Sequence, residues 1–373
     1  MTKTAITYLE KNVYETAKER ILHSMDLFDS LCVAFSGGKD SLAVLHLVEE
    51  VFKENGIKRP VSVFFRDEEL IPPEVIEFVQ RHAKMTTRYD FYYYAVQLES
   101  EKYVLGEKQS YIQWDESRNW IRSKPKNAIT SVKGYAENHV FSQYDMDEVI
   151  AGNFKGKVGI FNGIRADESL VRFKACVEKK KENYINATKS KRVSFIKPIY
   201  DWTQTDVFKY FYEKKIKYCP IYDAQMWNDE ELRVSTPVHA ERAKIIDKLK
   251  TLYPDFYEDV MRVFTDMDLQ SRYYSSYDKK SDFSKYSQNW IGIFKWIDDN
   301  ITDPKSKKLA RQRVKECRMM RENHRKRGTA SPDNFFGYPM LHIFNQIANG
   351  SYKRWIQPLK KPTKAMIAFE NGT

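Results

Sequence analysis

The six residues 36–41, with the sequence SGGKDS, place two hydroxyls, two adjacent glycines, a lysine and an aspartate next to one another. They stand between an apolar run, residues 31–35, and a segment with helical apolar spacing. Glycines let a ligand approach the backbone, and the free amides of a helix N-terminus attract anions. The pattern matches neither GxxxxGK[ST] nor GxGxxG. It predicts a phosphate-binding loop made of Ser36, Gly37, Gly38, Lys39, Asp40 and Ser41.

Asp40 is the unusual member of this loop, because a carboxylate repels phosphate. Its presence is explained if it helps to hold Mg²⁺, which proteins bind through one or two carboxylates together with substrate phosphates. We therefore expect Asp40 to be a metal ligand. With Lys39 it is also a candidate catalytic residue. A tight strand-to-helix turn without a ligand is the alternative, but such a turn needs none of these polar groups.

A second polar segment, FNGIRADES, ends the fourth apolar run. Gly163 permits close approach, and the guanidinium of Arg165 offers a planar fork of donors suited to phosphate. The acids that follow, including Glu168, suit the start of a helix, so capping alone could explain them. A cation at that position is unfavourable without an anion, and Arg172 is expected on the same face. We predict that Gly163, Arg165, Glu168 and Arg172 contact phosphate and that Arg165 is catalytic.

Two further residues have alternative interpretations. Asp67 follows the second apolar run and is either a simple loop acid or an acceptor for a ribose hydroxyl or an adenine amine, that is, an adenosine-binding residue. Cys219 precedes a proline in an expected loop, which makes it a candidate thiol. The other interpretation, a buried reduced thiol, is also the expectation for the remaining three cysteines. The four are far apart and predict neither a zinc site nor an iron–sulfur cluster.

Apolar runs alternate with helical patterns along the first two thirds of the chain, which predicts a parallel sheet flanked by helices. The expected strands are residues 31–35, 61–65, 89–96, 158–164 and 193–199. The expected helices are residues 7–28, 40–54, a helix from 72 or 73, 166–181, and 203–215 with a threonine cap. We therefore expect an α/β nucleotide-binding domain at 1–235, with an aromatic and polar insert at about 98–156, followed by a helical region at 236–373.

The chain of 373 residues has a formal net charge of +11, and this charge is clustered. Residues 305–327 carry eleven Lys or Arg and two Glu, within a basic helix expected at 303–327. Residues 174–197 form a second cluster, with eight against two. Such clusters are typical of proteins with a polyanionic partner, although a solvated helix face is the alternative. The candidate nucleic-acid contacts are Lys307, Lys308, Arg311, Arg313, Lys315 and Arg318.

The sequence has no apolar run close to the ~20 residues that a membrane span requires, and its N-terminal segment lacks the apolar centre of a signal peptide. These features predict a cytoplasmic protein without a membrane partner.

The motifs SGGKDS, GIRADES and KPIYDWTQTDVF, in this order, resemble the PP-loop ATP pyrophosphatase superfamily in its phosphoadenosine-phosphosulfate reductase-like branch. The segments YLEKNVYETAKERI, QWDESRNWIR and CPIYDAQMW are similar to immunoglobulin-binding-regulator-A-like proteins, as is the region ending in GSYKRW. The resemblance implies a Rossmann-like, HUP-type sheet of five parallel strands. It also implies ATP and Mg²⁺ as cofactors, with attack of an acceptor on the α-phosphate and release of pyrophosphate from the loop.

The resemblance leaves three functions open. One is an adenylating enzyme that acts on an unknown acceptor, in nucleic-acid modification or sulfur transfer. A second is a nucleotide-binding regulator with a ParB-like nuclease partner, because genes of this branch often accompany one. The third is a sulfonucleotide reductase, but the C-terminal cysteine motif of true reductases is missing, since the last cysteine is Cys317 within the basic helix.

Overall fold

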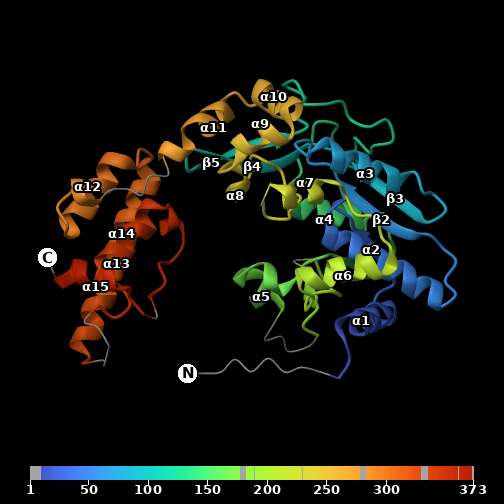
Figure 1. Ribbon diagram of the computed structural model, residues 1–373, viewed down its shortest axis with the longest axis horizontal. Helices are drawn as coiled ribbons and strands as arrows, with labels where there is room; N and C mark the ends of the chain where they lie inside the picture. The colour runs from blue at the N-terminus through green and yellow to red at the C-terminus, as the bar shows by residue number, and fades with distance from the viewer. Residues whose placement is uncertain are drawn as a thin grey trace. The chain divides into compact units, whose positions relative to one another are not determined.

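The computed structural model describes residues 10–176, 182–188, 190–228, 230–277, 283–328, 335–359 and 361–371. The chain forms two compact units (Figure 1). Unit 1 comprises Met1–Val104 and Lys108–Ser271, and unit 2 comprises Leu105–Glu107 and Arg272–Thr373. Residues 236–271, which the sequence assigned to the helical region, therefore belong to the α/β unit. No helix in the described ranges has the length and apolarity that crossing a bilayer requires.

Unit 1 is built on a six-stranded sheet with the strand order β3-β2-β1-β6-β8-β7. The five predicted strands are present and pair in parallel, which confirms the Rossmann-like class. The sixth strand, β7, has only three residues, pairs antiparallel with β8, and was not predicted. The bounds are β1 Ser30–Ala34, β2 Val61–Arg66, β3 Tyr89–Tyr94, β6 Val158–Phe161, β7 Ile185–Ala187 and β8 Val193–Ile196.

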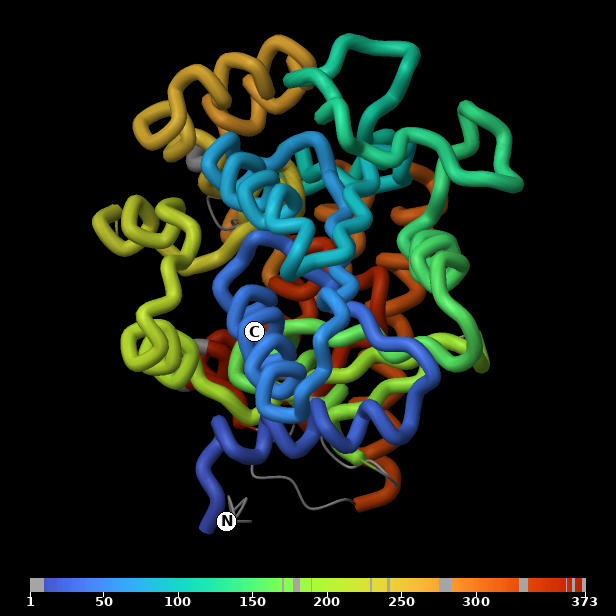
Figure 2. Tube along the Cα trace, turned by 90° about the vertical axis from the view of Figure 1, so that its right-hand side faces the viewer, coloured from blue at the N-terminus to red at the C-terminus, as the bar shows by residue number. Residues whose placement is uncertain are grey.

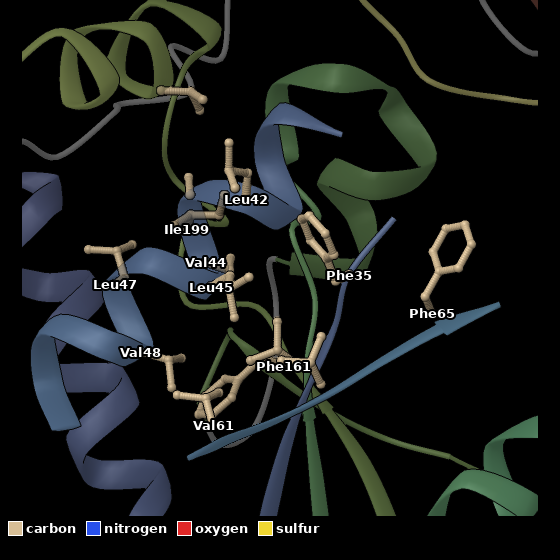
Figure 3. Packing of buried hydrophobic residues seen from close by; sticks show 14 of the residues in the cluster. Phe35, Leu42, Val44, Leu45, Leu47, Val48, Val61, Phe65, Phe161 and Ile199 are labelled. Atoms are coloured by element: carbon tan, nitrogen blue, oxygen red, sulfur yellow. The ribbon is translucent and has the colours of Figure 1, made fainter. Parts of the chain in front are cut away.

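Helices cover both faces of this sheet, which explains why the strands are apolar along their whole length. Leu31 and Val33 of β1 belong to the cluster on one face, and Cys32 belongs to the cluster on the other, where α4 packs. Figure 3 shows the first face, with Val48 of α2 near Val61 of β2. On this face α1 and α6 pack against α2. The bounds are α1 Val13–Leu27, α2 Lys39–Glu54, α3 Pro73–Ala83, α4 Gln143–Ala151 and α6 Gln204–Lys214.

The expected helices agree with these bounds where the structure describes them. Residues 7–9 of the first helix and 177–181 of the fourth lie outside the described residues. Residues 10–12 were expected in the first helix but are not helical, because Asn12 caps α1 through its side chain. The fourth consists of a 3₁₀ turn, Ala166–Glu168, and a short helix, α5 Leu170–Cys176. Thr203 caps α6 as predicted, through a reciprocal pair of hydrogen bonds with Asp206. The remaining helices of this unit are α7 Ile221–Trp227, α8 Ala240–Ala243, η2 Ile246–Lys248, α9 Leu249–Leu252 and α10 Pro254–Val263.

The insert after β3 contains a hairpin whose structure the sequence did not reveal. Its strands are β4 Leu98–Val104 and β5 Glu107–Gln113, and it lies beside α8–α10 in both views (Figures 1 and 2). Tyr111 of β5 packs against Phe264, with the two ring centroids 5.3 Å apart.

Unit 2 is helical, as predicted for the C-terminal region. Helix α11, Asp266–Tyr277, crosses from unit 1 into it. The basic helix α13 is capped by Asp303 and followed by Gly328, which has a φ of 62°. Ala310, Val314 and Cys317 form its buried face, so its charges occupy the remaining surface. The other elements are η3 Phe283–Lys285, α12 Trp290–Asn300, α13 Pro304–Lys326, α14 Met340–Ala348, η4 Ser351–Lys353 and α15 Lys364–Asn371.

Candidate functional site

The SGGKDS loop joins β1 to the N-terminus of α2 at the carboxyl end of the sheet, where open α/β sheets bind ligands. Ser36 and Ser41 face each other with their hydroxyl oxygens 3.0 Å apart. Ser41 Oγ accepts from the Ser36 amide, and Ser36 Oγ accepts from the Gly38 amide. These bonds fix the conformation of the loop backbone. The predicted phosphate loop is thus a real strand-to-helix turn whose hydroxyls organise it from within.

Two glycines of the site are required by close packing. Gly37 has a φ of 74°, and a Cβ there would lie 2.8 Å from Val79 and 2.9 Å from Val75. At Gly163, a Cβ would lie 2.5 Å from the carbonyl carbon of Asp40 and 2.6 Å from the Ser41 amide nitrogen. The close approach predicted for Gly163 is therefore to the backbone of the loop itself. This contact connects the end of β6 to the start of α2.

Lys39, Asp40 and Arg165 form one charge cluster at this point. Lys39 Nζ lies 2.8 Å from Asp40 Oδ2, and Arg165 Nε lies 2.7 Å from Asp40 Oδ1. Lys39 and Arg165 are each only 3% exposed, so the cluster is shielded from water. The Arg165–Asp40 contact is an ion pair with poor hydrogen-bond alignment, because neither of its two atoms has an aligned partner in the described part of the chain. Two buried cations thus share one carboxylate.

The sequence predicted that Arg165 faces phosphate, and here it faces carboxylates. Besides Asp40 it contacts Asp167, with Nη1 2.7 Å from Oδ2. The Glu168 carboxylate accepts from the Arg165 amide and also pairs with Arg172. These acids provide the anions that a cation at a helix start requires. The structure therefore brings Arg165 to the loop, whereas Glu168 and Arg172 bind each other beside it, and their contact with phosphate stays a prediction.

Tyr222 of α7 is a site residue that the sequence analysis missed. Its hydroxyl accepts from the Lys39 amide at 2.7 Å, so it caps the N-terminus of α2 where an anion was expected. Burial raises the pKa of Tyr222, which keeps the hydroxyl protonated and able to donate onward. Lys39 Nζ also donates to the Leu232 carbonyl, 3.1 Å away. The segment CPIYDAQMW carried the family resemblance, but nothing in its composition pointed to the loop.

Asp67 lies at the end of β2 with both carboxylate oxygens in use. Oδ1 accepts from the Glu69 amide and pairs with Arg122, and Oδ2 accepts from the Tyr93 hydroxyl at 2.7 Å. Glu69, fully buried, is held by Arg118 through two hydrogen bonds of 2.8 and 2.7 Å. These pairs anchor the insert to the sheet. Binding of adenosine by Asp67 stays a prediction, and the bonds that it makes here are structural.

The environment of Cys219 disfavours a reactive thiol. The side chain is fully buried, and burial raises its pKa to about 11. Only the thiolate is strongly nucleophilic, so little of the reactive form exists near neutral pH. Burial likewise raises the pKa of Cys317, to about 12, and that of Cys32. All four cysteines are buried and form no disulfide, as the interpretation of a buried reduced thiol expected.

The six candidate nucleic-acid contacts lie on α13, and their environments differ. Arg311 pairs with Asp298, Arg313 with Glu316 and Arg318 with Glu322. Lys307 donates to the carbonyl of Asp298. Lys308 and Lys315 are exposed. Nucleic-acid binding by this helix stays a prediction.

The donor set at the loop fits Mg²⁺ only in company with phosphate. Asp40 contributes a partly buried carboxylate, whose buried Oδ1 lacks an aligned hydrogen bond in the described part of the chain. The described residues hold no group of three or more His, Cys, Asp or Glu side chains arranged for a metal ion. One carboxylate plus nucleotide oxygens is the usual magnesium environment in nucleotide-binding enzymes.

A Rossmann-like sheet with this loop at its first strand defines a PP-loop protein. Residues 30–276, about two thirds of the chain, match the model of the phosphoadenosine phosphosulfate reductase domain. The chain therefore belongs to that family, as the motifs predicted.

The chain is 29% identical over 226 residues to "Uncharacterized protein YbdN" of Escherichia coli (strain K12). This match covers 58% of the chain and spans about half, 55%, of that relative's length.

Solved structures are similar at a lower level. A phosphoadenylyl-sulfate reductase of Candida auris, in complex with phosphate, has a TM-score of 0.33 and 15% identity, over 59% of this chain and 94% of that one. A Candida glabrata FMN adenylyltransferase, with FMN and the ATP analogue AMPCPP, has a TM-score of 0.38 and 13% identity, over 58% and 64%. No functional assignment follows from similarity of this degree.

Proposed function

We propose that this protein binds ATP at the SGGKDS loop and transfers its adenylyl group to an acceptor with release of pyrophosphate. The observation that carries the proposal is the buried cluster of Lys39, Asp40 and Arg165 at the N-terminus of α2. The two shielded cations at this helix N-terminus would hold an anion once they exchange a partner carboxylate for it, since Coulomb attraction is less screened there than in water. Membership of the family supports a nucleotide as the anion.

The reaction requires positioning and charge stabilisation more than covalent help from the protein. An acceptor oxygen forms a bond to the α-phosphorus while the bond from that phosphorus to the bridging oxygen breaks. The bridging oxygen keeps the electron pair and leaves as part of pyrophosphate. Lys39 and Arg165 would stabilise the charge that develops on this leaving group. Gly37, Gly38 and the hydroxyls of Ser36 and Ser41 would hold it in place.

Mg²⁺, if bound with the nucleotide, would be held by Asp40 and would neutralise phosphate charge. The role of this chain is then to keep Asp40 fixed between Lys39 and Arg165. Since both cations already contact Asp40, a nucleotide must draw at least one of them away from the carboxylate. Arg165 should leave Asp40 more easily than Lys39 does, because its Nε makes no well-directed hydrogen bond to that carboxylate.

Sulfonucleotide reduction is the weaker alternative. It needs a thiolate that attacks sulfur, and the cysteines of this chain are buried. The pKa of Cys219 and that of Cys317 are raised by that burial, which removes the thiolate at neutral pH. A nucleotide-binding regulator with a ParB-like partner would use the same nucleotide site and would differ only in not turning over ATP.

The experiment that tests this proposal follows the α-phosphate and the γ-phosphate of ATP separately. Purified protein is incubated with α-labelled or γ-labelled ATP, Mg²⁺ and extracts of nucleic acids or small molecules. The proposal predicts that the γ label appears in pyrophosphate and that the α label appears in AMP or an adenylated product. Release of the γ label as inorganic phosphate with ADP would refute it. Tight binding of ATP without any product would favour the regulator.

A further inference from the structure

A cavity of about 400 Å³ lies in unit 1 away from the SGGKDS loop. It is lined by residues of α2 and α3 and by the segment that follows α6, including His46, Phe78, Arg81, Lys215 and Lys217. His46 lies two turns into α2, whereas the loop precedes that helix. The volume is within the range of small-molecule sites. The cavity is therefore large enough for a ligand and is distinct from the phosphate loop.

The cavity has an apolar part and a cationic rim. Met85 and Ile216 provide apolar surface. Phe78 is only 4% exposed, because His82 packs against its ring with centroids 4.6 Å apart and the Arg81 guanidinium lies over it, 5.5 Å from its centroid. Burial lowers the pKa of His46 to about 4 and also lowers that of His82, so both imidazoles are neutral near pH 7. The charge at the cavity thus comes from its lysines and arginines, which are Arg81, Arg88, Lys214, Lys215 and Lys217.

Three of these cations are not neutralised by the protein. Arg88 pairs with Glu49, and Lys214 pairs with Glu50, the single carboxylate of the lining. Arg81, Lys215 and Lys217 are exposed and have no carboxylate partner among the described residues. The rim therefore presents an excess of three positive charges beside an apolar surface. Cations near helix ends are favourable in themselves, so charge alone is not evidence of a ligand.

The backbone of Lys215 provides an independent observation. It has a φ of 54° and ψ of 39°, the left-handed conformation in which helices usually end with glycine. A residue with a Cβ costs about 1 kcal/mol there relative to glycine. The chain keeps a lysine at a position where glycine would be more stable, and that lysine lines the cavity. Local strain of this kind is a reason to look for function.

From the cavity, its three unneutralised cations and the strained Lys215, we propose that this site binds a phosphorylated ligand with a flat ring, a mononucleotide being the simplest example. The phosphate would lie among Arg81, Lys215 and Lys217, and the ring would lie against Met85 and Ile216. The inference is independent of the adenylylation chemistry, since it uses none of the loop residues.

The test uses AMP as the probe and isothermal titration calorimetry as the measurement. The background is the full chain carrying Lys39→Ala, which weakens the loop site. We expect AMP binding to weaken about 10-fold in Arg81→Ala plus Lys217→Ala. In Lys215→Gly it should weaken about 3-fold while the urea midpoint of unfolding stays equal or rises. The matched control is Lys209→Ala, an exposed lysine of α6 outside the cavity.

Opposite results overturn the inference. If AMP binds no better than inorganic phosphate, the ring has no site and the rim is only surface charge. AMP affinities equal in all the variants, or no AMP binding at all, would also refute it. Because every protein in this experiment carries Lys39→Ala, these outcomes do not depend on whether the loop of the wild-type protein binds ATP.

Discussion

Two regions beside α2 contain cations in opposite states. At its N-terminus, Lys39 and Arg165 are buried and paired with Asp40. Beside its middle, Arg81, Lys215 and Lys217 surround the cavity next to His46, exposed and without carboxylate partners in the described part of the chain. The buried cations need an exchange of partners before they bind a ligand, whereas the exposed ones need none. The first arrangement favours selectivity for a strongly charged ligand. The second favours easy, salt-sensitive binding.

The largest expected effect concerns the buried end. We predict that Lys39→Ala weakens ATP binding about 100-fold or more, because it removes a cation from a shielded site and leaves Asp40 to repel phosphate. Isothermal titration calorimetry with a non-hydrolysable ATP analogue measures the change. Lys53→Ala, an exposed lysine in the last turn of the same helix, is the control and should bind normally. Equal affinities in the two variants would show that the comparison is mistaken.

The middle of α2 gives a prediction of pH dependence. Burial lowers the pKa of His46 to about 4, below its ordinary 6.5, so the folded protein resists protonation that the unfolded chain accepts. This contribution to stability is complete above pH 6.5 and is lost as the pH falls to 4, amounting to about 2–3 kcal/mol. Urea unfolding of wild type and His46→Gln between pH 7.5 and 4 measures it.

The His46→Gln variant should lose less stability over this range than the wild type. His23→Gln, at an exposed histidine of α1, should follow the wild-type curve. Parallel curves for wild type and His46→Gln would mean that the His46 imidazole is hydrated in the folded protein and that burial does not lower its pKa.

Close packing at the loop predicts a smaller effect for Gly163→Ala. The new Cβ would meet the backbone of Asp40 and Ser41, which cannot yield as a side chain would. We expect a loss of about 1–3 kcal/mol in unfolding free energy and about 10-fold weaker ATP binding, with AMP binding at the cavity unchanged. Gly152→Ala is a suitable control, because the closest atom to its Cβ, a helix carbonyl oxygen, is 3.1 Å away. Normal ATP binding by Gly163→Ala would contradict the described contact.

The smallest effect is expected at Cys219. With its pKa raised to about 11, roughly one thiol in 100 is ionised at pH 9. We predict that Cys219→Ser changes ATP turnover less than 2-fold and that iodoacetamide leaves Cys219 unmodified in the native protein at pH 8. Rapid alkylation, followed by peptide mapping, would show that the thiol is accessible. A loss of turnover in the serine variant would restore a thiol mechanism.

The same two regions show what could be predicted from sequence. The loop was predictable because its residues are contiguous, and a strand, two glycines and a helix start specify a backbone geometry by themselves. The five parallel strands were predictable because both their faces are covered. Tyr222 and the cavity were not, since they depend on contacts between distant segments. Arg165 lies beside the loop, as its position after the fourth strand suggested, and its contact with phosphate stays a prediction. Its partners Asp40 and Asp167 could be known only from the packing of β6 against α2.

The central claim is that Arg165 and Lys39 exchange carboxylate for nucleotide phosphate. A crystal structure with AMPCPP and Mg²⁺ tests it most directly. We predict phosphate oxygens within hydrogen-bond distance of the SGGKDS loop and the Arg165 guanidinium moved from Asp40 or Asp167 onto a phosphate. A nucleotide bound elsewhere, with Arg165 still held between those two carboxylates, would contradict the account.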